Sequence, residues 1–455
     1  MGAFDLSSLC GVLDGQVEGV DAQFSQVSID SRTLEKGDLF VALRGNNFDG
    51  HRFIMQAQQA GACAAMVSSN TESSVVKLKV KDTLFALGEL ARLNRMRYQG
   101  PLIAITGSAG KTTTKNILSA ITSSSEPTLA TQGNRNNEIG VPLTLLEIGE
   151  QHRFVIVEMG AARAGDINYL CNIARPNISV LLNAMPAHLS GFGSLEGVAS
   201  AKGEIVAGLD SSSTAVINRD SPFFEAWQRN AGSAKVIDFG FDSKAMVSAS
   251  ELKLLPAGGM KFQLHTPTTS SQVEFSLLGK HNVMNALAAV AAAVAAKIDI
   301  DTICRGLLSV EAAPGRLFSL PQLGSYMLID DSYNANPNAV MAAIDVLAQY
   351  SGHRFLLLGD MSELGDESIK LHTDIGSYAR DKGIDGLWAI GELSTLAAKA
   401  FGSSGKTFDD KKDMIATARR LLGSGDTVLV KGSRTAEMDE VVAALNFNNK
   451  NEKES

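Results

Sequence analysis

The stretch that decides the fold runs from Leu102 to Thr114 and reads LIAITGSAGKTTT. Its first four residues are apolar and predict a short buried strand, a glycine-rich turn follows, and residues 113–123 predict a helix. A strand, a tight loop and a helix in this order place backbone N–H groups at the positive end of the helix, which suits a polyphosphate. In such a loop Lys111 reaches the terminal phosphates, and the Thr112 hydroxyl is a ligand of Mg²⁺.

The pattern departs from the usual phosphate-loop spacing at one position. A glycine normally stands five residues before the last glycine, whereas this chain has Ile105 there and Gly107 three residues before Gly110. A Gly-Lys-Thr sequence in a random loop means little, but the same residues directly after an apolar strand are much rarer. We therefore expect nucleotide binding, and the alternative is an ordinary strand-to-helix turn.

Length, charge and cysteine content bound the class of protein. The chain has 455 residues, too many for one hydrophobic core, and a net charge of −8 that argues against general nucleic-acid binding. Four scattered cysteines fit neither a zinc spacing nor a disulfide framework, and we expect reduced thiols in a cytoplasmic protein. The N-terminus carries no signal-peptide pattern, and the longest apolar stretch, residues 286–296, is too short to span a membrane.

The chain predicts three α/β domains, at residues 1–98, 99–313 and 314–455. The first is small, with strands expected at 27–32, 38–43 and 64–67 and helices at 53–62 and 83–97. In the second, strands and helices alternate, which predicts a mostly parallel sheet of the phosphate-loop ATPase type with helices on both faces; its strand runs are 102–105, 154–157, 178–182 and 215–217.

One later segment departs from this alternation, and another repeats it. Residues 235–278 show period-two patterns and predict an antiparallel extension, after which a long alanine-rich helix begins. Beyond the break at residues 313–317, four strand candidates separated by helical stretches predict a second, Rossmann-like doubly wound sheet.

Candidate metal ligands stand at the carboxyl ends of predicted parallel strands, the edge at which ligands bind. Glu158 ends the apolar run 154–157 and could hold Mg²⁺ beside the loop, although a charge can also simply end a strand. His188 follows another such run and is either a metal ligand or a hydrogen-bonded loop residue. Lys202 lies in a helical stretch, where spacing alone predicts a solvated surface lysine.

Clustered amides are further candidates for ligand binding. Asn134, Asn136 and Asn137 crowd one loop, where they serve ordinary turn chemistry or grip a polar substrate. Asn282 and Asn285 share one helix face by their spacing, and Asn282 is alternatively only an N-cap.

Two adjacent aspartates of the third domain are also candidate ligand-binding residues. Asp330 and Asp331 end a strand of the third domain, where they form either a charged turn or part of a ligand site shared with the second domain.

Together these blocks resemble the Mur ligases, the ATP-dependent amide-forming enzymes of peptidoglycan precursor synthesis. The resemblance covers nearly the whole chain and includes the shortened phosphate loop. The blocks that carry it are DSR at 30–32, GDLFVAL at 37–43, TGSAGKT at 106–112, EMG at 158–160, His188 with GFGS at 191–194, KGE at 202–204, His281-Asn282 with Asn285, PGR at 314–316 and Asp331.

Three further blocks resemble one branch of the family, which joins D-alanyl-D-alanine to UDP-N-acetylmuramoyl-tripeptide and so makes the pentapeptide precursor of peptidoglycan. They are GNRNNEIGVP at 133–142, DDSYNANP at 330–337 and LGDMSELG at 358–365. The Asp-Asn-Pro-Arg block of the diaminopimelate-adding branch is absent from the sequence.

The resemblance implies a role for each matched residue of the ATP site. Thr112 and Glu158 hold one Mg²⁺, His188 helps to hold a second, and Lys202, carbamylated by CO₂, becomes an anionic ligand of that second ion. The expected catalytic residues are Lys111, Glu158, His188, Lys202, Arg316 and Asp331. The expected ATP contacts are Gly107, Ser108, Ala109, Gly110, Lys111, Thr112, Thr113, Asn282, Asn285, Arg316 and Asp331.

The resemblance also implies where the other substrates bind. The first domain takes the UDP end of the sugar nucleotide, through Ser31, Arg32, Asp49, Gly50 and His51. The peptide carboxylate and the incoming dipeptide face Asn134, Asn136, Asn137, Tyr333, Asn334 and Asn336. The third domain carries the amine substrate and closes onto ATP, with residues 314–315 at the joint.

Related activities stay open at this point. A diaminopimelate- or lysine-adding Mur ligase and a folylpolyglutamate synthase share the nucleotide domain and the chemistry, a phosphate-loop kinase would stop after phosphorylation, and a nucleotide switch would hydrolyse ATP slowly. Neither the third residue of the peptide nor the oligomeric state follows from the sequence. We expect a cytoplasmic monomer that acts on small molecules, with no nucleic-acid partner.

Overall fold

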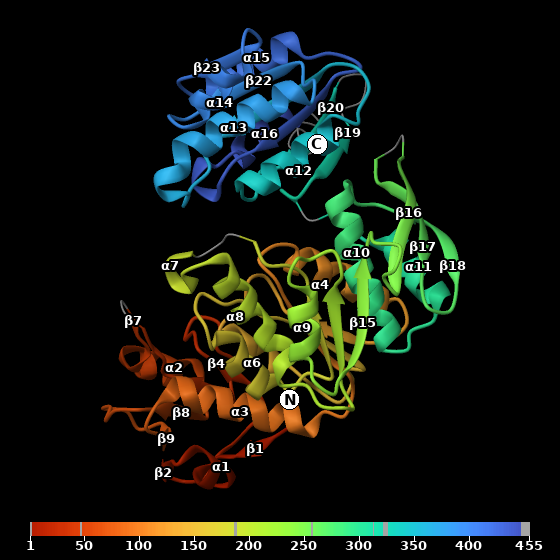
Figure 1. Ribbon diagram of the computed structural model, residues 1–455. Coiled ribbons are helices and arrows are strands. Elements are labelled where there is room, and N and C mark those ends of the chain that lie inside the picture. Colours follow the sequence, from red (N-terminus) through yellow and green to blue (C-terminus); the bar gives the residue numbers. More distant parts are fainter. Residues whose placement is uncertain are drawn as a thin grey trace, which may run out of the picture. The chain divides into compact units, whose positions relative to one another are not determined.

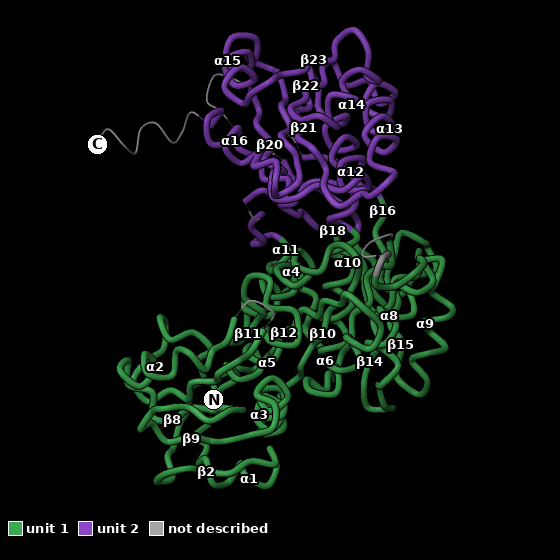
Figure 2. The backbone as a smooth tube through the Cα atoms, turned by 90° about the vertical axis from the view of Figure 1, so that its left-hand side faces the viewer, with its two compact units in different colours: residues 1–250, 264–271, 284–307 green, residues 251–263, 272–283, 308–455 purple. Residues whose placement is uncertain are grey.

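The computed structural model describes residues 2–45, 48–185, 189–255, 258–312, 314–321 and 326–446. The chain forms two compact units, drawn in different colours in Figure 2. Unit 1 consists of residues 1–250, 264–271 and 284–307, and unit 2 of residues 251–263, 272–283 and 308–455. The helices and strands are labelled in Figure 1.

Unit 1 begins with a small five-stranded sheet in the order β2-β9-β8-β5-β4. Its strands are β2 (Gln16–Glu18), β4 (Val27–Ser28), β5 (Leu39–Val41), β8 (Ala64–Val67) and β9 (Val76–Lys79). All neighbours pair in parallel except β2, which runs antiparallel to β9 at the edge. The predicted strand at 27–32 stops at Ser28, because the Asp30 carboxylate accepts the Arg32 N–H and closes a turn.

Two short antiparallel strand pairs and four helical segments complete this layer. β1 (Phe4–Asp5) pairs with β3 (Gln23–Phe24), and β6 (Arg44–Gly45) pairs with β7 (Phe48–Asp49). The helical segments are α1 (Leu6–Leu13), η1 (Gly50–Phe53), α2 (Ile54–Ala60) and α3 (Thr83–Arg97). The predicted helix at 83–97 is confirmed, and it begins there because the Asp82 carboxylate accepts the N–H groups of Leu84 and Phe85.

Helix α3 joins this layer to the central sheet within unit 1. Its inward residues, among them Leu87 and Leu90, share one hydrophobic core with Leu145 of α5 (Gly140–Leu146) and Leu170 of α6 (Asp166–Ala174). Burial of this shared apolar surface explains why the first two predicted domains form one compact unit.

The C-terminal turn of α3 also supplies polar groups to two helix ends. The Asn94 carboxamide donates to the carbonyls of Leu145 and Ile148 after α5. The buried Arg95 guanidinium donates to the carbonyls of Ala174 and Arg175 at the end of α6. Since the last carbonyls of a helix have no intrahelical donor, these two side chains satisfy groups that burial would otherwise leave without a partner.

The central sheet has nine strands in the order β11-β12-β10-β13-β14-β15-β16-β17-β18. They are β10 (Leu102–Thr106), β11 (Thr128–Ala130), β12 (Phe154–Glu158), β13 (Ile178–Leu181), β14 (Thr214–Asn218), β15 (Lys235–Gly240), β16 (Val247–Leu254), β17 (Met260–His265) and β18 (Ser270–Phe275). The further helices of this part are α4 (Lys111–Ser123), α7 (Leu189–Phe192), α8 (Leu195–Ala207), α9 (Phe224–Asn230), α10 (Lys280–Ala295) and α11 (Ile300–Ser309).

The parallel part of the sheet extends further than the sequence predicted. β15 pairs in parallel with both β14 and β16, so the antiparallel expectation is wrong for residues 235–240. The reason is α9, which supplies the crossover that a parallel neighbour needs. The strands β16, β17 and β18 each divide their residues between the two units.

Helix α10 is the predicted alanine-rich helix. It begins at Lys280, so Asn282 lies inside its first turn and the N-cap reading of this residue is wrong. The Asn282 amide donates to the Leu278 carbonyl, and the alanines from Ala286 to Ala293 are fully buried. Among the described residues, no helix has both the length and the apolar character needed to cross a membrane.

Unit 2 contains a six-stranded sheet in the order β19-β20-β24-β21-β22-β23. β19 (Phe318–Pro321) is antiparallel to β20 (Met327–Asp331), and the other pairs, which confirm a mostly parallel sheet, are parallel. The remaining strands are β21 (Arg354–Gly359), β22 (Gly386–Ile390), β23 (Gly405–Phe408) and β24 (Thr427–Lys431). The helices are α12 (Pro337–Leu347), η2 (Gly365–Glu367), α13 (Ser368–Asp381), α14 (Ser394–Phe401), α15 (Lys411–Leu421), η3 (Arg434–Ala436) and α16 (Asp439–Leu445).

Helices cover both faces of this sheet, as a doubly wound fold requires. Leu356 and Leu358 of β21 belong to the core formed with α12, α13 and α14. Leu357, which points to the opposite face, belongs to the core formed with α15 and α16.

Candidate active site

The phosphate loop lies between β10 and α4, as predicted. β10 is buried in the middle of its sheet, between β12 and β13. Gly110 caps α4 with φ of 83°, and a side chain there would strike the Asn285 carboxamide, so the position needs glycine. Lys111 folds back and donates to the Gly107 carbonyl over 2.7 Å. The first-turn N–H groups of α4 lack intrahelical acceptors by helix geometry, and they form a positive end at the loop.

Asn183, which sequence reasoning missed, holds the loop in shape. Its carbonyl accepts the Ser108 N–H over 3.1 Å, and its side chain accepts the Ala109 N–H and donates to the Ala109 carbonyl, both over 3.0 Å. The N–H groups of Ser108 and Ala109, which we expected at the phosphates, are therefore engaged by Asn183. A signal was present, because Asn183 follows β13 at the carboxyl end of a neighbouring parallel strand, as Glu158 does on β12.

Glu158 and Thr112 face each other beside the loop. The Thr112 hydroxyl donates to Oε2 of Glu158 over 2.9 Å, and the Asn136 amide donates to Oε1 over 2.8 Å. Glu158 is only 2% exposed, so its carboxylate depends on these donors in place of water. The pair supplies two oxygen ligands at one point of the loop.

Lys202 is buried within α8, and the surface reading of this residue is wrong. Lys202 is only 3% exposed, and its Nζ lies 5.7 Å from the ring centroid of Phe192. Burial, assisted by the positive charge of Lys111, lowers the pKa of the Lys202 ammonium to about 8. Asp166 and Glu204 act in the opposite direction. A lysine in this environment carries a substantial neutral amine fraction near neutral pH.

One cavity of about 920 Å³ in unit 1 is lined by part of the phosphate loop and by Lys202. Its lining includes Gly107, Ser108 and Lys111 of the loop, Asn136, Asn137, residues 160–166, Phe192 and Lys202, and it extends to Asp82, Leu84 and Phe85 at the start of α3. Its volume is that of a site for a small organic ligand.

The three loop asparagines have different environments. Asn136 reaches Glu158, as described. Asn137 accepts the N–H groups of Ile139 and Gly140 with its side-chain oxygen and so shapes the start of α5. Asn134 is exposed and lies outside the cavity lining.

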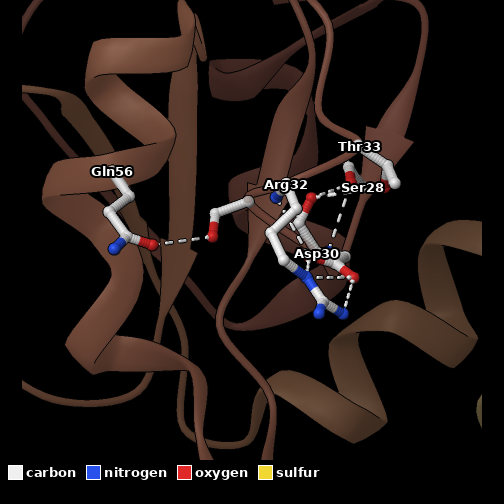
Figure 3. A network of polar contacts seen from close by, with 6 residues as sticks. Ser28, Asp30, Arg32, Thr33 and Gln56 are labelled. Carbon is white, nitrogen blue, oxygen red and sulfur yellow. Dashed lines mark hydrogen bonds and ion pairs between the residues drawn. The ribbon is translucent and has the colours of Figure 1, made fainter.

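In the first domain, the predicted nucleotide residues Ser31 and Arg32 lie on an exposed turn. The Ser31 hydroxyl donates to Gln56 of α2 over 3.2 Å. The Arg32 guanidinium donates to both carboxylate oxygens of Asp30 (Figure 3). These bonds hold the pKa of the Asp30 carboxyl at about 2. The Arg32 side chain is 85% exposed, so its outer face is open to a ligand.

Hydrogen bonds give structural roles to the next three predicted residues, Asp49, Gly50 and His51. His51 accepts the Ser68 N–H at Nε2, over 3.0 Å, and lies 2.7 Å from Asp49 at Nδ1. Because Nε2 is an acceptor, Nδ1 carries the proton and donates to Asp49. The Gly50 N–H donates to the Leu43 carbonyl over 2.7 Å.

In unit 2, Asp331 is buried against a residue that sequence reasoning missed. Lys431 Nζ lies 2.5 Å from Oδ2 of Asp331 and also donates to the Asn334 carbonyl. Burial raises the pKa of the Asp331 carboxyl, whereas Lys431 opposes this. Lys431 ends a parallel strand, so the criterion that found Glu158 applies to it too.

The other predicted residues of unit 2 make local contacts. The Arg316 guanidinium lies 4.6 Å from the ring centroid of Tyr333, which is 47% exposed. Asn336 caps α12 by accepting the Ala339 N–H. The Asn334 side chain accepts the Ala335 N–H.

A second cavity, of about 660 Å³, lies within unit 2 at the carboxyl ends of β21, β22 and β24. The hydroxyls of Ser362, Ser433 and Thr435 contact one another there, with Ser362 2.7 Å from Thr435 and 3.0 Å from Ser433. Lys411 also belongs to the lining, together with Asp360 and Glu363. The Lys411 ammonium lies 2.8 Å from Oε2 of Glu440, so the lining carries groups of both charges and its ammonium is already paired.

Comparison with known proteins gives matches along the chain. The Mur ligase catalytic domain matches residues 23–101, the Mur ligase middle domain residues 105–293, and the Mur ligase glutamate ligase domain residues 315–434. The chain belongs to the Mur ligase family. It is 41% identical to the UDP-N-acetylmuramoyl-tripeptide–D-alanyl-D-alanine ligase of Escherichia coli K12, over 97% of this chain and 98% of that one.

Solved structures of the Mur ligase family agree with this. MurF from Acinetobacter baumannii matches with a TM-score of 0.90 and 34% identity, over 98% of this chain and 99% of that one. MurF from Thermotoga maritima, solved in complex with ADP, matches with a TM-score of 0.83 and 29% identity, over 94% and 98% of the two chains.

The residues present fit the Mg²⁺ ion that the family implies at the phosphate loop. Mg²⁺ binds through one or two protein oxygens together with phosphates and water, and Thr112 and Glu158 supply such oxygens. Within the described residues, no group of three or more His, Cys, Asp or Glu side chains is placed to hold a metal. His188, the predicted ligand of a second ion, lies outside the described residues.

Proposed function

We propose that this Mur ligase joins D-alanyl-D-alanine to UDP-N-acetylmuramoyl-tripeptide at the expense of ATP. The carrying observation is the cavity of unit 1, in which the phosphate loop, the amide cluster and the buried Lys202 line one space. The 41% identity with the Escherichia coli enzyme of that name, over nearly the full length of both chains, supports the substrate pair.

The chemistry needs an activated carboxylate, because oxide is a poor leaving group. An oxygen of the terminal tripeptide carboxylate attacks the γ-phosphorus of ATP, ADP leaves, and an acyl phosphate forms. The α-amine of the dipeptide then attacks the acyl carbon, phosphate leaves with the P–O bond intact, and the amine proton is released. Lys111 and the N-terminal end of α4 offset the negative charge that develops on the transferred phosphoryl group.

We propose that Thr112 and Glu158 hold one Mg²⁺ and that His188 and Lys202 hold a second. When bound, these ions act as Lewis acids and orient the phosphoryl group. Lys202 enters this role as a carbamate: its neutral amine attacks CO₂, a C–N bond forms, and one proton leaves. The lowered pKa and the burial of Lys202 support this step, because only the neutral amine is nucleophilic.

We propose that unit 2 carries the dipeptide and closes on the nucleotide. Tyr333, Asn334 and Asn336 remain candidates for the dipeptide, and Arg316 and Asp331 for ATP. The second cavity, which includes Ser362 and Thr435 in its lining, supports a place in this unit for a small polar ligand such as the dipeptide. On the sugar-nucleotide side, the exposed turn of Ser31 and Arg32 supports a contact with the diphosphate, while Asp49, Gly50 and His51 shape that surface.

The test is a phosphate-release assay against a matrix of precursor nucleotides and amines, with the amide product followed by mass spectrometry. We expect phosphate release only when ATP, UDP-N-acetylmuramoyl-tripeptide and D-alanyl-D-alanine are all present. Phosphorylated product without amide would identify a kinase, and release with ATP alone would identify a nucleotide switch. Comparison of diaminopimelate- and lysine-containing tripeptides determines the third residue.

A further inference from the structure

The carboxylate of Glu158 is held by a segment that the reaction scheme has not used. Residues 131–136 leave the end of β11 and run beside the end of β12. Within this segment Asn136 was expected to contact substrate. Its amide is instead 2.8 Å from Oε1 of Glu158, and a carboxylate can only accept, so Asn136 is the donor.

Four further contacts fix this segment between the loop helix and β12. Thr131 donates its N–H to the Ile156 carbonyl over 3.0 Å, and its hydroxyl accepts the Glu158 N–H over 3.0 Å. Its carbonyl accepts from the buried Lys115 of α4 over 2.7 Å. The Gly160 N–H donates to the Asn136 carbonyl over 2.7 Å. The segment is therefore tied on both sides of Glu158.

Close packing shows that the position of Asn136 is specified. A Cβ atom built on Gly160 would lie 2.8 Å from Oδ1 of Asn136, closer than real contacts allow. The Asn136 carboxamide thus packs against Gly160 at a distance that leaves no room for a side chain there.

We propose that Asn136 is a positioning residue that aims the Glu158 carboxylate at the cation of the phosphate loop, and that Thr131 supports it. The two side-chain donors of Glu158 bind different oxygens of its carboxylate. Thr112 bonds to Oε2, on the side of the loop, whereas Asn136 bonds to Oε1 and does not compete with a cation for Oε2. Partners of this kind orient metal ligands, and their loss commonly weakens metal binding about 10- to 100-fold.

The proposal rests on the proposed function for the identity of the nucleotide, and the experiment separates the two. Mn²⁺ is titrated into the full-length chain with saturating ADP, and free Mn²⁺ is followed by electron paramagnetic resonance. We expect Asn136→Ala to weaken Mn²⁺ binding about tenfold, while Gln132→Ala, at an exposed position of the same segment, binds as the wild type does. The KM for UDP-N-acetylmuramoyl-tripeptide should stay within about twofold in Asn136→Ala at saturating Mg²⁺.

Substitution of Thr131 provides an independent test if Asn136→Ala unfolds at a much lower temperature than the wild type. Thr131→Val keeps the shape and removes the acceptor of the Glu158 N–H, so Mn²⁺ binding should weaken, and Thr131→Ser should restore it. Unchanged Mn²⁺ affinity in both Asn136→Ala and Thr131→Val overturns the proposal, and a raised tripeptide KM with unchanged Mn²⁺ affinity assigns Asn136 to the substrate. Failure of amide formation by the wild type would overturn the proposed function instead, because Mn²⁺ binding with ADP does not depend on it.

Discussion

Burial separates Lys202 from an ordinary helix lysine. Its pKa falls from the usual ammonium range to about 8 because desolvation penalises the charged form and Lys111 repels it. At such a pKa roughly a tenth of the amines are neutral at pH 7 and about half at pH 8. The fraction of neutral, nucleophilic Lys202 amine therefore increases with pH, and the increase is centred at about pH 8.

We predict that carbamylation of Lys202 increases with pH through about 8, at a fixed concentration of dissolved CO₂. The measurement is ¹³C NMR of the protein under ¹³CO₂, followed at the carbamate resonance. In the control Lys202→Ala the resonance should vanish and activity should fall about 100-fold, with partial rescue by short carboxylic acids. Full activity of that variant without added acid would rule out the carbamate.

Lys111 offers a second prediction at this scale. Lys111→Ala should abolish ATP turnover, because the ammonium that meets the terminal phosphates is gone. The fold should survive, since alanine favours the first turn of α4. Activity is measured by phosphate release and folding by circular dichroism. ATP turnover equal to that of the wild type would contradict the phosphate-loop assignment.

At the scale of elements, α3 stabilises unit 1 through its last turn. Arg95 donates to the carbonyls of Tyr98, Ala174 and Arg175 and to the Asn177 side chain. Removing the guanidinium leaves buried acceptors without donors, each of which costs about 1–3 kcal/mol. The same helix carries Arg92, whose partner Glu89 lies at the surface side of the helix.

We predict that Arg95→Met lowers the free energy of unfolding by about 3 kcal/mol, while Arg92→Met lowers it by less than about 1 kcal/mol. Urea unfolding measures the difference, and hydrogen–deuterium exchange locates it. Amides at the end of α6 should lose protection only in Arg95→Met. Equal losses in the two variants would mean that the contacts of Arg95 with the helix ends carry no special weight.

Local sequence patterns predicted most helices and strands, whereas features that depend on long-range contacts were missed. The strand at 102–105 and the helix at 83–97 were predictable because the spacing of apolar residues within a short window indicates them. The environment of Lys202 was not predictable from spacing, because burial depends on which elements cover a helix. The bond between Asn136 and Glu158 joins a loop residue after β11 to the end of β12, and the pairing of β11 with β12 brings the two segments together.

For the molecule as a whole, the two compact units do not divide where the sequence placed its joint. The expected hinge at residues 314–315 lies inside unit 2, where the Gly315 N–H donates to the Asp330 carboxylate over 2.9 Å. The chain passes between the units at several points, including strands β16 to β18 and helix α10. A movement of unit 2 as a whole would therefore involve these connections, and the joint at residues 314–315 stays a prediction.

We predict that the chain becomes more compact when it binds a non-hydrolysable ATP analogue, the tripeptide nucleotide and D-alanyl-D-alanine together. An acyl phosphate hydrolyses in water, so the proposed reaction needs a closed site, and lids that close around reactive intermediates commonly serve this purpose. Small-angle X-ray scattering should give a smaller radius of gyration with all three ligands than with the tripeptide nucleotide alone. Lys111→Ala should show no such decrease, because the analogue would bind poorly to the altered phosphate loop. An unchanged radius for the wild type with all three ligands would mean that water is excluded by the cavity of unit 1 itself.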